Sequence, residues 1–129
     1  MPTPSNKKIL CVDDSGDDCE LYRFILSEAG YEIEIAQSVS SALVFLENSI
    51  FNLCLSDLSL PDGTGFELLN TIRAVDASLL FIVLSADARL STQERAIQAG
   101  AQAFFPKPID YDLLVASIDQ LLSIEAAVY

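Results

Sequence analysis

The sequence predicts a single α/β domain in which a doubly wound, five-stranded parallel sheet carries five helices on its two faces. Two observations lead to this class. Short apolar runs alternate with helix-like patterns along the whole chain, and such alternation is typical of parallel sheets with right-handed crossovers. The length of 129 residues fits one domain with a substantial core. We expect the flavodoxin-like strand order 2-1-3-4-5, in which the first strand is central.

The first strand–helix unit has clear start and stop signals. The apolar run 9–12 predicts the first strand, and two acidic residues follow it. Ser15, with Asp18 three residues later, resembles a capping box that begins the first helix, and Gly30 is a natural end for it. The apolar stripe that we expect this helix to bury consists of Leu21, Phe24, Ile25 and Ala29.

The second unit and the third strand follow in the same order. Charged and apolar residues alternate over 32–36, as in a half-exposed edge strand. Ser38 or Ser40 can cap the second helix. The apolar run 53–55 suits a strand buried on both faces, and it leads to Asp57 and a turn rich in proline and glycine.

The last third of the chain completes the alternation. We expect the third helix over about 66–75, the fourth strand over 79–84, the fourth helix over 92–99 and the fifth strand over 103–105. Asp110 can cap the fifth helix. The residues of that helix expected to face the core are Leu113, Leu114, Ile118, Leu121 and Leu122.

Composition excludes several classes of function. The formal net charge of -12, from 19 acids and 7 bases, argues against nucleic acid as a partner, because phosphate binding needs clustered Lys and Arg. The chain has no histidine, so His nucleophiles, bases and metal ligands are absent. The apolar runs are far too short for a membrane span, and no secretory signal begins the chain. We therefore expect a cytoplasmic domain over residues 7–125, with short tails over 1–6 and 126–129.

The acidic residues that carry chemistry follow neighbouring strands. Asp13 and Asp14 follow the first strand, and Asp57 follows the third. In the predicted order these strands are neighbours at the topological switch point, so the three carboxylates should converge there. Three close carboxylates repel one another unless a cation lies among them. Carboxylate oxygens, with the backbone carbonyl of Ser59 as a further ligand, suit Mg²⁺.

Two further polar residues reach the same edge of the sheet. Ser85 ends the fourth strand, and Lys107 follows the fifth. An aspartate carboxylate can attack a phosphoryl group, while a divalent ion, an ammonium and a hydroxyl stabilise the phosphoryl oxygens. Taken singly, Asp57 also suits a turn cap, Ser85 a turn hydroxyl and Lys107 an ordinary surface charge. Together they indicate phosphoryl acceptance at Asp57.

These motifs resemble the receiver domain of two-component response regulators, over roughly residues 7–125. The motifs that carry the resemblance are Val12-Asp13-Asp14, Asp57 with Leu60-Pro61-Asp62-Gly63, Leu84-Ser85-Ala86, and Gly100-Ala101 through Lys107-Pro108. The resemblance implies that Asp57 is the phosphoacceptor, that Asp14 binds Mg²⁺ directly, that Asp13 acts mainly through water, and that Ser59 offers its carbonyl.

The same resemblance assigns the residues that bind the phosphoryl group and switch the domain. Ser85 would be the switch hydroxyl, and the small Ala86 beside it would leave the phosphoryl site open. Lys107 would pair with the phosphate, and the Lys107–Pro108 peptide bond would be cis. Phe104 falls at the position of the family's switch aromatic residue.

The implied function is a signalling switch rather than a metabolic enzyme, like a stand-alone chemotaxis response regulator. A histidine kinase or histidine phosphotransfer protein would donate the phosphoryl group, and a downstream protein would bind the face of the fourth helix, fifth strand and fifth helix. No basic residue follows Lys107, so we expect a monomer or a weak apolar dimer.

Three alternatives stay open at this point. The domain could be a phosphorelay intermediate that passes its phosphate on, or a pseudo-receiver that docks without being phosphorylated. It could also be an aspartyl-phosphate phosphatase. Enzymes of the haloacid dehalogenase type carry a second Asp two residues after the nucleophile, where this chain has Ser59.

Overall fold

The parallel sheet has the predicted order, as shown by a computed structural model that describes residues 7–127 and the side chains of residues 7–123. Its five long strands lie in the order β2-β1-β3-β6-β7. All neighbouring pairs in this sheet are parallel, so the flavodoxin-like order 2-1-3-4-5 is confirmed. The strands are β1 (Lys8–Val12), β2 (Glu32–Ala36), β3 (Leu53–Asp57), β6 (Leu80–Ser85) and β7 (Ala103–Pro106).

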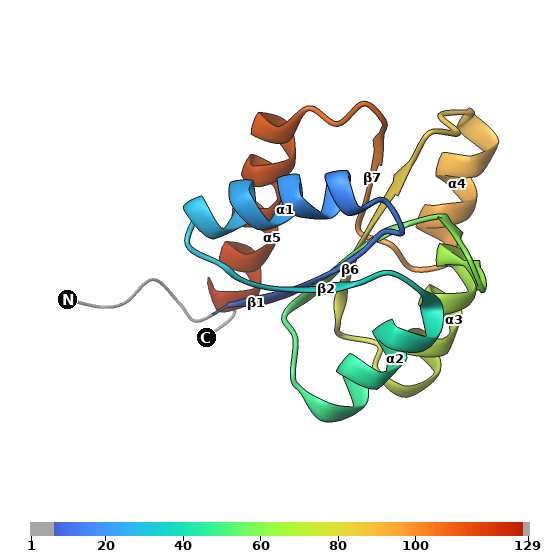
Figure 1. Cartoon of the computed structure of the whole chain (residues 1–129), viewed down its shortest axis with the longest axis horizontal. Helices are drawn as coiled ribbons and strands as arrows, with labels where there is room; N and C mark the ends of the chain where they lie inside the picture. Colours follow the sequence, from blue (N-terminus) through green and yellow to red (C-terminus); the bar gives the residue numbers. More distant parts are fainter. Residues whose placement is uncertain (1–6, 128–129) are drawn as a thin grey trace.

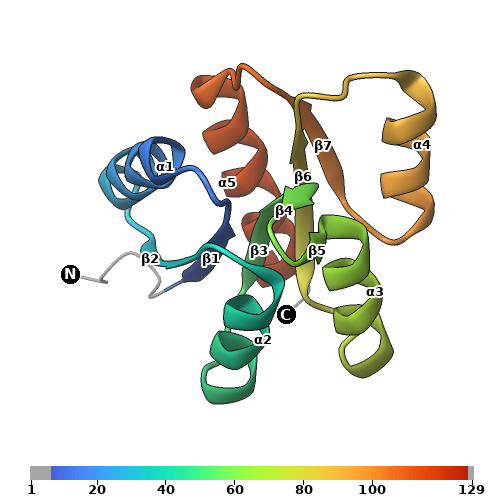
Figure 2. The same ribbon diagram turned by 45° about the vertical axis from the view of Figure 1, so that its right-hand side comes forward.

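The five predicted helices cover both faces of the sheet (Figures 1 and 2). The helices α1 and α5 lie over one face, where their apolar residues join one core cluster. The helices α2, α3 and α4 cover the opposite face and a second cluster. The helices are α1 (Gly16–Glu28), α2 (Val39–Asn48), α3 (Gly65–Val75), α4 (Leu90–Gln98) and α5 (Tyr111–Ala127).

The register of the central strands brings their carboxyl ends to one edge of the sheet. Val12 pairs with Ser56, and Asp57 pairs with Leu84. The side chains of β3 are buried except at Asp57, as expected for a strand covered on both faces. Asp57 is therefore the residue at which the buried strand emerges at the edge.

The predicted turn after β3 is a small antiparallel hairpin, formed by β4 (Ser59–Leu60) and β5 (Gly63–Thr64). Gly65, at the start of α3, donates its N–H to the carbonyl of Leu58 at 2.9 Å. A Cβ atom at Gly65 would lie 2.5 Å from the backbone oxygen of Asp57. The hairpin therefore folds back tightly against the strand end that carries Asp57.

The buried face of α1 differs from the predicted stripe. The helix buries Cys19, Tyr22 and Leu26, whereas Leu21 is 45% exposed and Phe24 is 67% exposed. Both sets of residues have helical spacing, so apolar periodicity does not separate them. Tyr22 can be buried because its hydroxyl has a buried hydrogen-bond partner.

The prediction for the last helix also needs correction. In α5, Leu114, Ile118 and Leu122 are buried as expected, but Leu113 is 55% exposed. The helix continues through Ala127, because alanine favours helix and no glycine or proline ends it. Residues 1–6 and 128–129 of the predicted tails lie outside the described residues. No helix in the described part is both long and apolar enough to cross a membrane.

Candidate phosphoryl-transfer site

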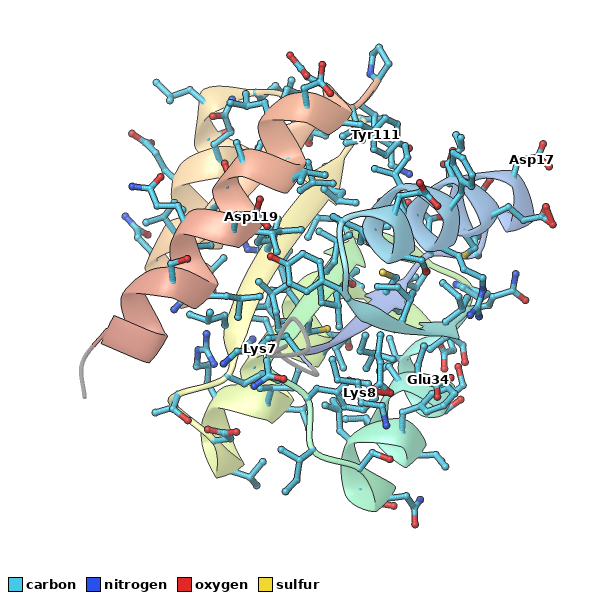
Figure 3. All side chains as sticks on the ribbon, turned by 90° about the vertical axis from the view of Figure 1, so that its left-hand side faces the viewer. Lys7, Lys8, Asp17, Glu34, Tyr111 and Asp119 are labelled. Carbon is cyan, nitrogen blue, oxygen red and sulfur yellow. The ribbon has the colours of Figure 1, made fainter. Side chains whose placement is uncertain are left out.

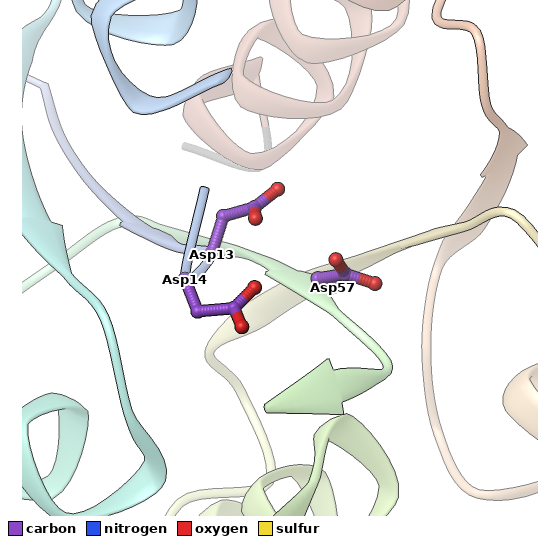
Figure 4. A group of neighbouring side chains, drawn as sticks. All are labelled: Asp13, Asp14 and Asp57. Atoms are coloured by element: carbon purple, nitrogen blue, oxygen red, sulfur yellow. The ribbon is translucent and has the colours of Figure 1, made fainter. Parts of the chain in front are cut away.

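Three carboxylates meet where β1 and β3 end (Figure 4). One oxygen of each of Asp13, Asp14 and Asp57 lies within 4.8 Å of the other two. Their exposures differ, because the side chain of Asp13 is fully buried, that of Asp57 is 13% exposed, and Asp14 is exposed. The sequence prediction that these acids converge is correct.

Lys107 supplies the positive charge among these acids. Its Nζ lies 2.9 Å from Asp13 Oδ2, 3.0 Å from Asp57 Oδ2 and 3.2 Å from Asp18 Oδ2. Three acceptors match the three N–H donors of an ammonium group. Burial lowers the pKa of Lys107, but the hydrogen bonds with Asp13 and Asp57 raise it by more, so its pKa lies above the ordinary value. Lys107 is therefore a cation throughout the physiological pH range.

Asp18 is a site residue that the sequence reasoning assigned elsewhere. Ser15 accepts a hydrogen bond from the Asp18 backbone N–H at 3.2 Å, so the predicted helix cap is present. The Asp18 carboxylate, however, bonds to Lys107 instead of completing a capping box. The two residues are 89 positions apart, which is why a local motif did not reveal the contact.

Asp13 and Asp14 have different bonding capacity. Asp13 Oδ1 accepts from the backbone N–H of Ser15 at 3.0 Å, and Asp13 Oδ2 accepts from the Tyr22 hydroxyl at 2.7 Å and from Lys107. Within the described residues, no hydrogen bond reaches the Asp14 carboxylate. Asp14 therefore offers free oxygens to a metal ion, while Asp13 has most of its acceptor positions filled.

Each of the two carboxylate oxygens of Asp57 accepts a hydrogen bond. Its Oδ2 accepts from Lys107, and its Oδ1 accepts from the backbone N–H of Ser59 at 3.3 Å. Ser59 is exposed, and it is the residue predicted to offer its carbonyl to the metal. The donor set consists of oxygen atoms, which fits Mg²⁺ and does not suit softer metals.

An open cavity of about 510 Å³ lies over Asp57. Its lining includes Ser85, Ala86 and Lys107 from the predicted set, together with Arg95 from α4 and Arg89, which immediately precedes that helix. A concave, open hollow of this kind gives a small phosphorylated group access to the carboxylate.

Ser85 is the last residue of β6, and hydrogen bonds from Lys107, which follows β7, and from Asp87 hold it in place. Its backbone carbonyl accepts from the Lys107 N–H at 2.8 Å, and its Oγ accepts from the Asp87 N–H at 2.9 Å. In the described part of the chain its hydroxyl donates to no group, so its proton is available to a ligand. The Lys107–Pro108 peptide bond that follows is cis.

Phe104 does not line the cavity over Asp57. Its half-buried ring packs against the core cluster beneath α4 and borders a separate surface hollow with Leu90 and Ile97. Among the predicted site residues, Asp13, Asp14, Asp57, Ser85 and Lys107 are thus brought together, and Phe104 lies behind them.

Tyr22 is the second site residue that sequence reasoning missed. It is 1% exposed, and burial followed by the hydrogen bond with Asp13 raises its pKa far above the ordinary value. The hydroxyl therefore keeps its proton and donates a hydrogen bond to Asp13. Its position one helical turn after Asp18 was the available signal, because residues four apart share a helix face.

Fold and site together define a class: a flavodoxin-like α/β domain with an acidic cation site and a lysine at the switch point. The model of the response regulator receiver domain family matches residues 9–119. The chain belongs to this family. Receiver domains are signalling switches that take phosphate from histidine kinases or phosphotransfer proteins and bind Mg²⁺ at an acidic pocket.

Individual relatives agree with this assignment. The chain is 33% identical over 122 residues, 93% of each chain, to an uncharacterized 14.6 kDa protein in the sodA1 3′ region of Leptolyngbya boryana. It is 29% identical over 121 residues to the transcriptional regulatory protein ZraR of Escherichia coli strain K12, covering 94% of this chain and 27% of ZraR. The chain thus spans about a quarter of ZraR.

A solved structure gives the same answer. The crystal structure of a CheY-like response regulator receiver domain protein from Methanospirillum hungatei JF-1 is similar with a TM-score of 0.90 and 34% sequence identity. The match covers 97% of this chain and 100% of that chain.

Proposed function

We propose that the Asp57 carboxylate accepts a phosphoryl group from the phosphohistidine of a histidine kinase or histidine phosphotransfer protein. The observation that carries this proposal is the arrangement at Asp57: its carboxylate faces an open cavity and is held 3.0 Å from the Lys107 ammonium. A carboxylate oxygen forms the new bond to phosphorus while the bond from phosphorus to the donor nitrogen breaks. The electron pair of that bond leaves with the donor imidazole.

The other residues of the site bind the metal and the transferred group. Bound Mg²⁺ would neutralise charge on the phosphoryl oxygens. Asp14 and Asp57 would hold the ion with the Ser59 carbonyl, and Asp13, whose oxygens are largely occupied, would act through a water molecule. Lys107 would pair with one phosphoryl oxygen.

Ser85 would transmit the modification to the surface. Its hydroxyl, which donates to no group in the described structure, would donate to a phosphoryl oxygen. This movement would vacate space beneath α4 for the Phe104 ring, because packed cores switch between discrete arrangements. The small Ala86 would keep the entrance open.

The face of α4, β7 and α5 is the proposed output surface. Its exposed apolar residues, Leu90, Ile97 and Leu113, are between 50% and 68% exposed. A downstream protein would dock there, and the same residues would support at most a weak apolar dimer. The switch would turn over phosphate only through its own phosphorylation and dephosphorylation.

Incubation with Mg²⁺ and acetyl phosphate tests this function. Wild type should gain one phosphate that is labile in base, Asp57→Asn should gain none, and Asp62→Asn is the matched control. Asp62 lies in the hairpin after β3, but its carboxylate accepts hydrogen bonds from the N–H groups of Val39 and Ser40. Equal labelling of wild type and Asp57→Asn would refute the proposal.

Labelling and turnover assays with other phosphate donors and substrates separate the alternatives. No labelling from acetyl phosphate or from a phosphorylated phosphotransfer protein would indicate a pseudo-receiver. Repeated release of phosphate from p-nitrophenyl phosphate would indicate a phosphatase. Rapid return of phosphate from Asp57 to a phosphotransfer histidine would indicate a phosphorelay intermediate.

A further inference from the structure

The hydrogen bond between Tyr22 and Asp13 joins a helix to the cation site through buried groups. The Tyr22 hydroxyl donates to Asp13 Oδ2 at 2.7 Å. Asp13 is fully buried and Tyr22 is 1% exposed. A carboxylate in such surroundings needs its hydrogen-bond donors, because water cannot replace them.

Helix α1 holds Asp13 at more than one atom. About one helical turn before Tyr22, the Cys19 thiol donates to the backbone carbonyl of Asp13 at 3.1 Å. At the beginning of the helix, the Ser15 N–H donates to Asp13 Oδ1 at 3.0 Å. These contacts fix both the backbone and the carboxylate plane of Asp13 from one side of the site.

The hydrogen bond from Tyr22 also opposes the attraction of the Asp13 carboxylate toward Lys107. Asp13 Oδ2 accepts from both Tyr22 and Lys107, whose Nζ is also 3.0 Å from Asp57 Oδ2. Without the Tyr22 hydroxyl, the ammonium is the remaining donor to that oxygen, so Asp13 would rotate toward it. The Asp13 carboxylate would then change its orientation relative to Asp14 and Asp57, with which it now shares a cluster of oxygens within 4.8 Å of one another.

We propose that Tyr22 is a positioning residue for the cation site, whose hydroxyl orients Asp13 toward an ion held by Asp14 and Asp57. This inference rests on the proposed function, because it assumes Mg²⁺ binding at those acids. Groups that orient metal-binding carboxylates typically change metal affinity about 10–100-fold when removed. Asp13 acts through water in our proposal, so we expect the low end, about tenfold.

A purely structural role for Tyr22 makes a different prediction. Its ring packs near Tyr111, with centroids 6.4 Å apart and an angle of 53° between the rings, and Figure 3 shows Tyr111 at the start of α5, beside α1. Tyr22→Phe keeps this packing and removes only the hydroxyl. If the ring alone matters, Tyr22→Phe will leave Mg²⁺ affinity unchanged.

The experiment is calorimetric titration of Mg²⁺ into the full chain of wild type, Tyr22→Phe and the control Tyr111→Phe. The Kd for Mg²⁺ should rise about tenfold in Tyr22→Phe and stay unchanged in Tyr111→Phe. Phosphorylation by acetyl phosphate should need correspondingly more Mg²⁺ in Tyr22→Phe, yet reach the wild-type rate at saturating Mg²⁺. A urea titration of each variant shows that it is folded.

The outcomes separate this inference from the proposed function. A Kd in Tyr22→Phe within twofold of wild type, with wild type binding Mg²⁺ through Asp14, overturns the role of Tyr22 alone. Failure of wild type to bind Mg²⁺ overturns both. A reduced phosphorylation rate that excess Mg²⁺ does not restore also contradicts a positioning role exerted through the metal.

Discussion

Replacing Lys107 with methionine should destabilise the metal-free domain and strengthen its binding of Mg²⁺. Methionine is an unbranched, uncharged side chain that can occupy much of the space of the lysine stem. The substitution leaves Asp13, Asp18 and Asp57 facing one another without their shared cation. Their mutual repulsion then opposes folding, and a divalent ion relieves it.

The size of the effect follows from the contacts of Lys107. At distances of 2.9 to 3.2 Å to three carboxylates, each contact gives roughly 5–6 kcal/mol of attraction at an effective dielectric constant of about 20. Desolvation of the ammonium offsets much of this attraction. Removing one partner of a buried ion pair costs about 3–5 kcal/mol, and we expect about 3 kcal/mol because Lys107 is 20% exposed and Asp18 is 35% exposed.

The assay is urea unfolding of wild type, Lys107→Met and Arg89→Met, with and without Mg²⁺. Arg89→Met removes the same charge from an exposed pair with Asp87, so it should cost no more than about 1 kcal/mol. Mg²⁺ should stabilise Lys107→Met more than wild type, by about 1.4 kcal/mol for each tenfold gain in affinity. Equal losses in both variants, or equal stabilisation by Mg²⁺, would refute the reasoning.

Three further predictions address the metal ligand, the switch and a buried thiol. Asp14→Ala should abolish Mg²⁺ binding in a calorimetric titration, yet match or exceed wild type in metal-free stability, because one repelling carboxylate is gone; retained affinity would contradict the role of Asp14. Ser85→Ala should still accept phosphate, but NMR should show Phe104 keeping its unphosphorylated shifts; wild-type shift changes would disprove the coupling. Burial, followed by the charge of Asp13, raises the pKa of Cys19 from 9.0 to about 11. The unfolded chain therefore loses this proton first, so stability should fall between about pH 9 and 11, and Cys19→Ala should lessen that fall in urea titrations.

The sequence predicted the architecture well because strand–helix alternation and crossover handedness leave few topologies. The convergence of Asp13, Asp14 and Asp57 followed from that strand order alone, since carboxyl ends of neighbouring parallel strands meet. The hairpin formed by 59–60 and 63–64 was not predicted, because two-residue strands are too short to show periodicity.

The contacts made by α1 could not be predicted from the sequence, for a different reason. Leu21 and Phe24 form a more apolar stripe than Cys19 and Tyr22, so hydrophobicity favoured the wrong face. The tyrosine belongs inside only because a buried carboxylate accepts its hydroxyl, and that partner is visible only in three dimensions. Local sequence patterns do not predict such polar contacts between distant segments.

The most direct test of the central claim is to locate the modified residue. After phosphorylation with acetyl phosphate and Mg²⁺, borohydride reduction converts an aspartyl phosphate to homoserine, which mass spectrometry of peptides can assign to a position. We predict homoserine at residue 57 and at no other acid, with Asp13 and Asp14 unchanged. Homoserine at residue 13 or 14 instead, or its absence from a protein that has taken up phosphate, would contradict Asp57 as the phosphoacceptor.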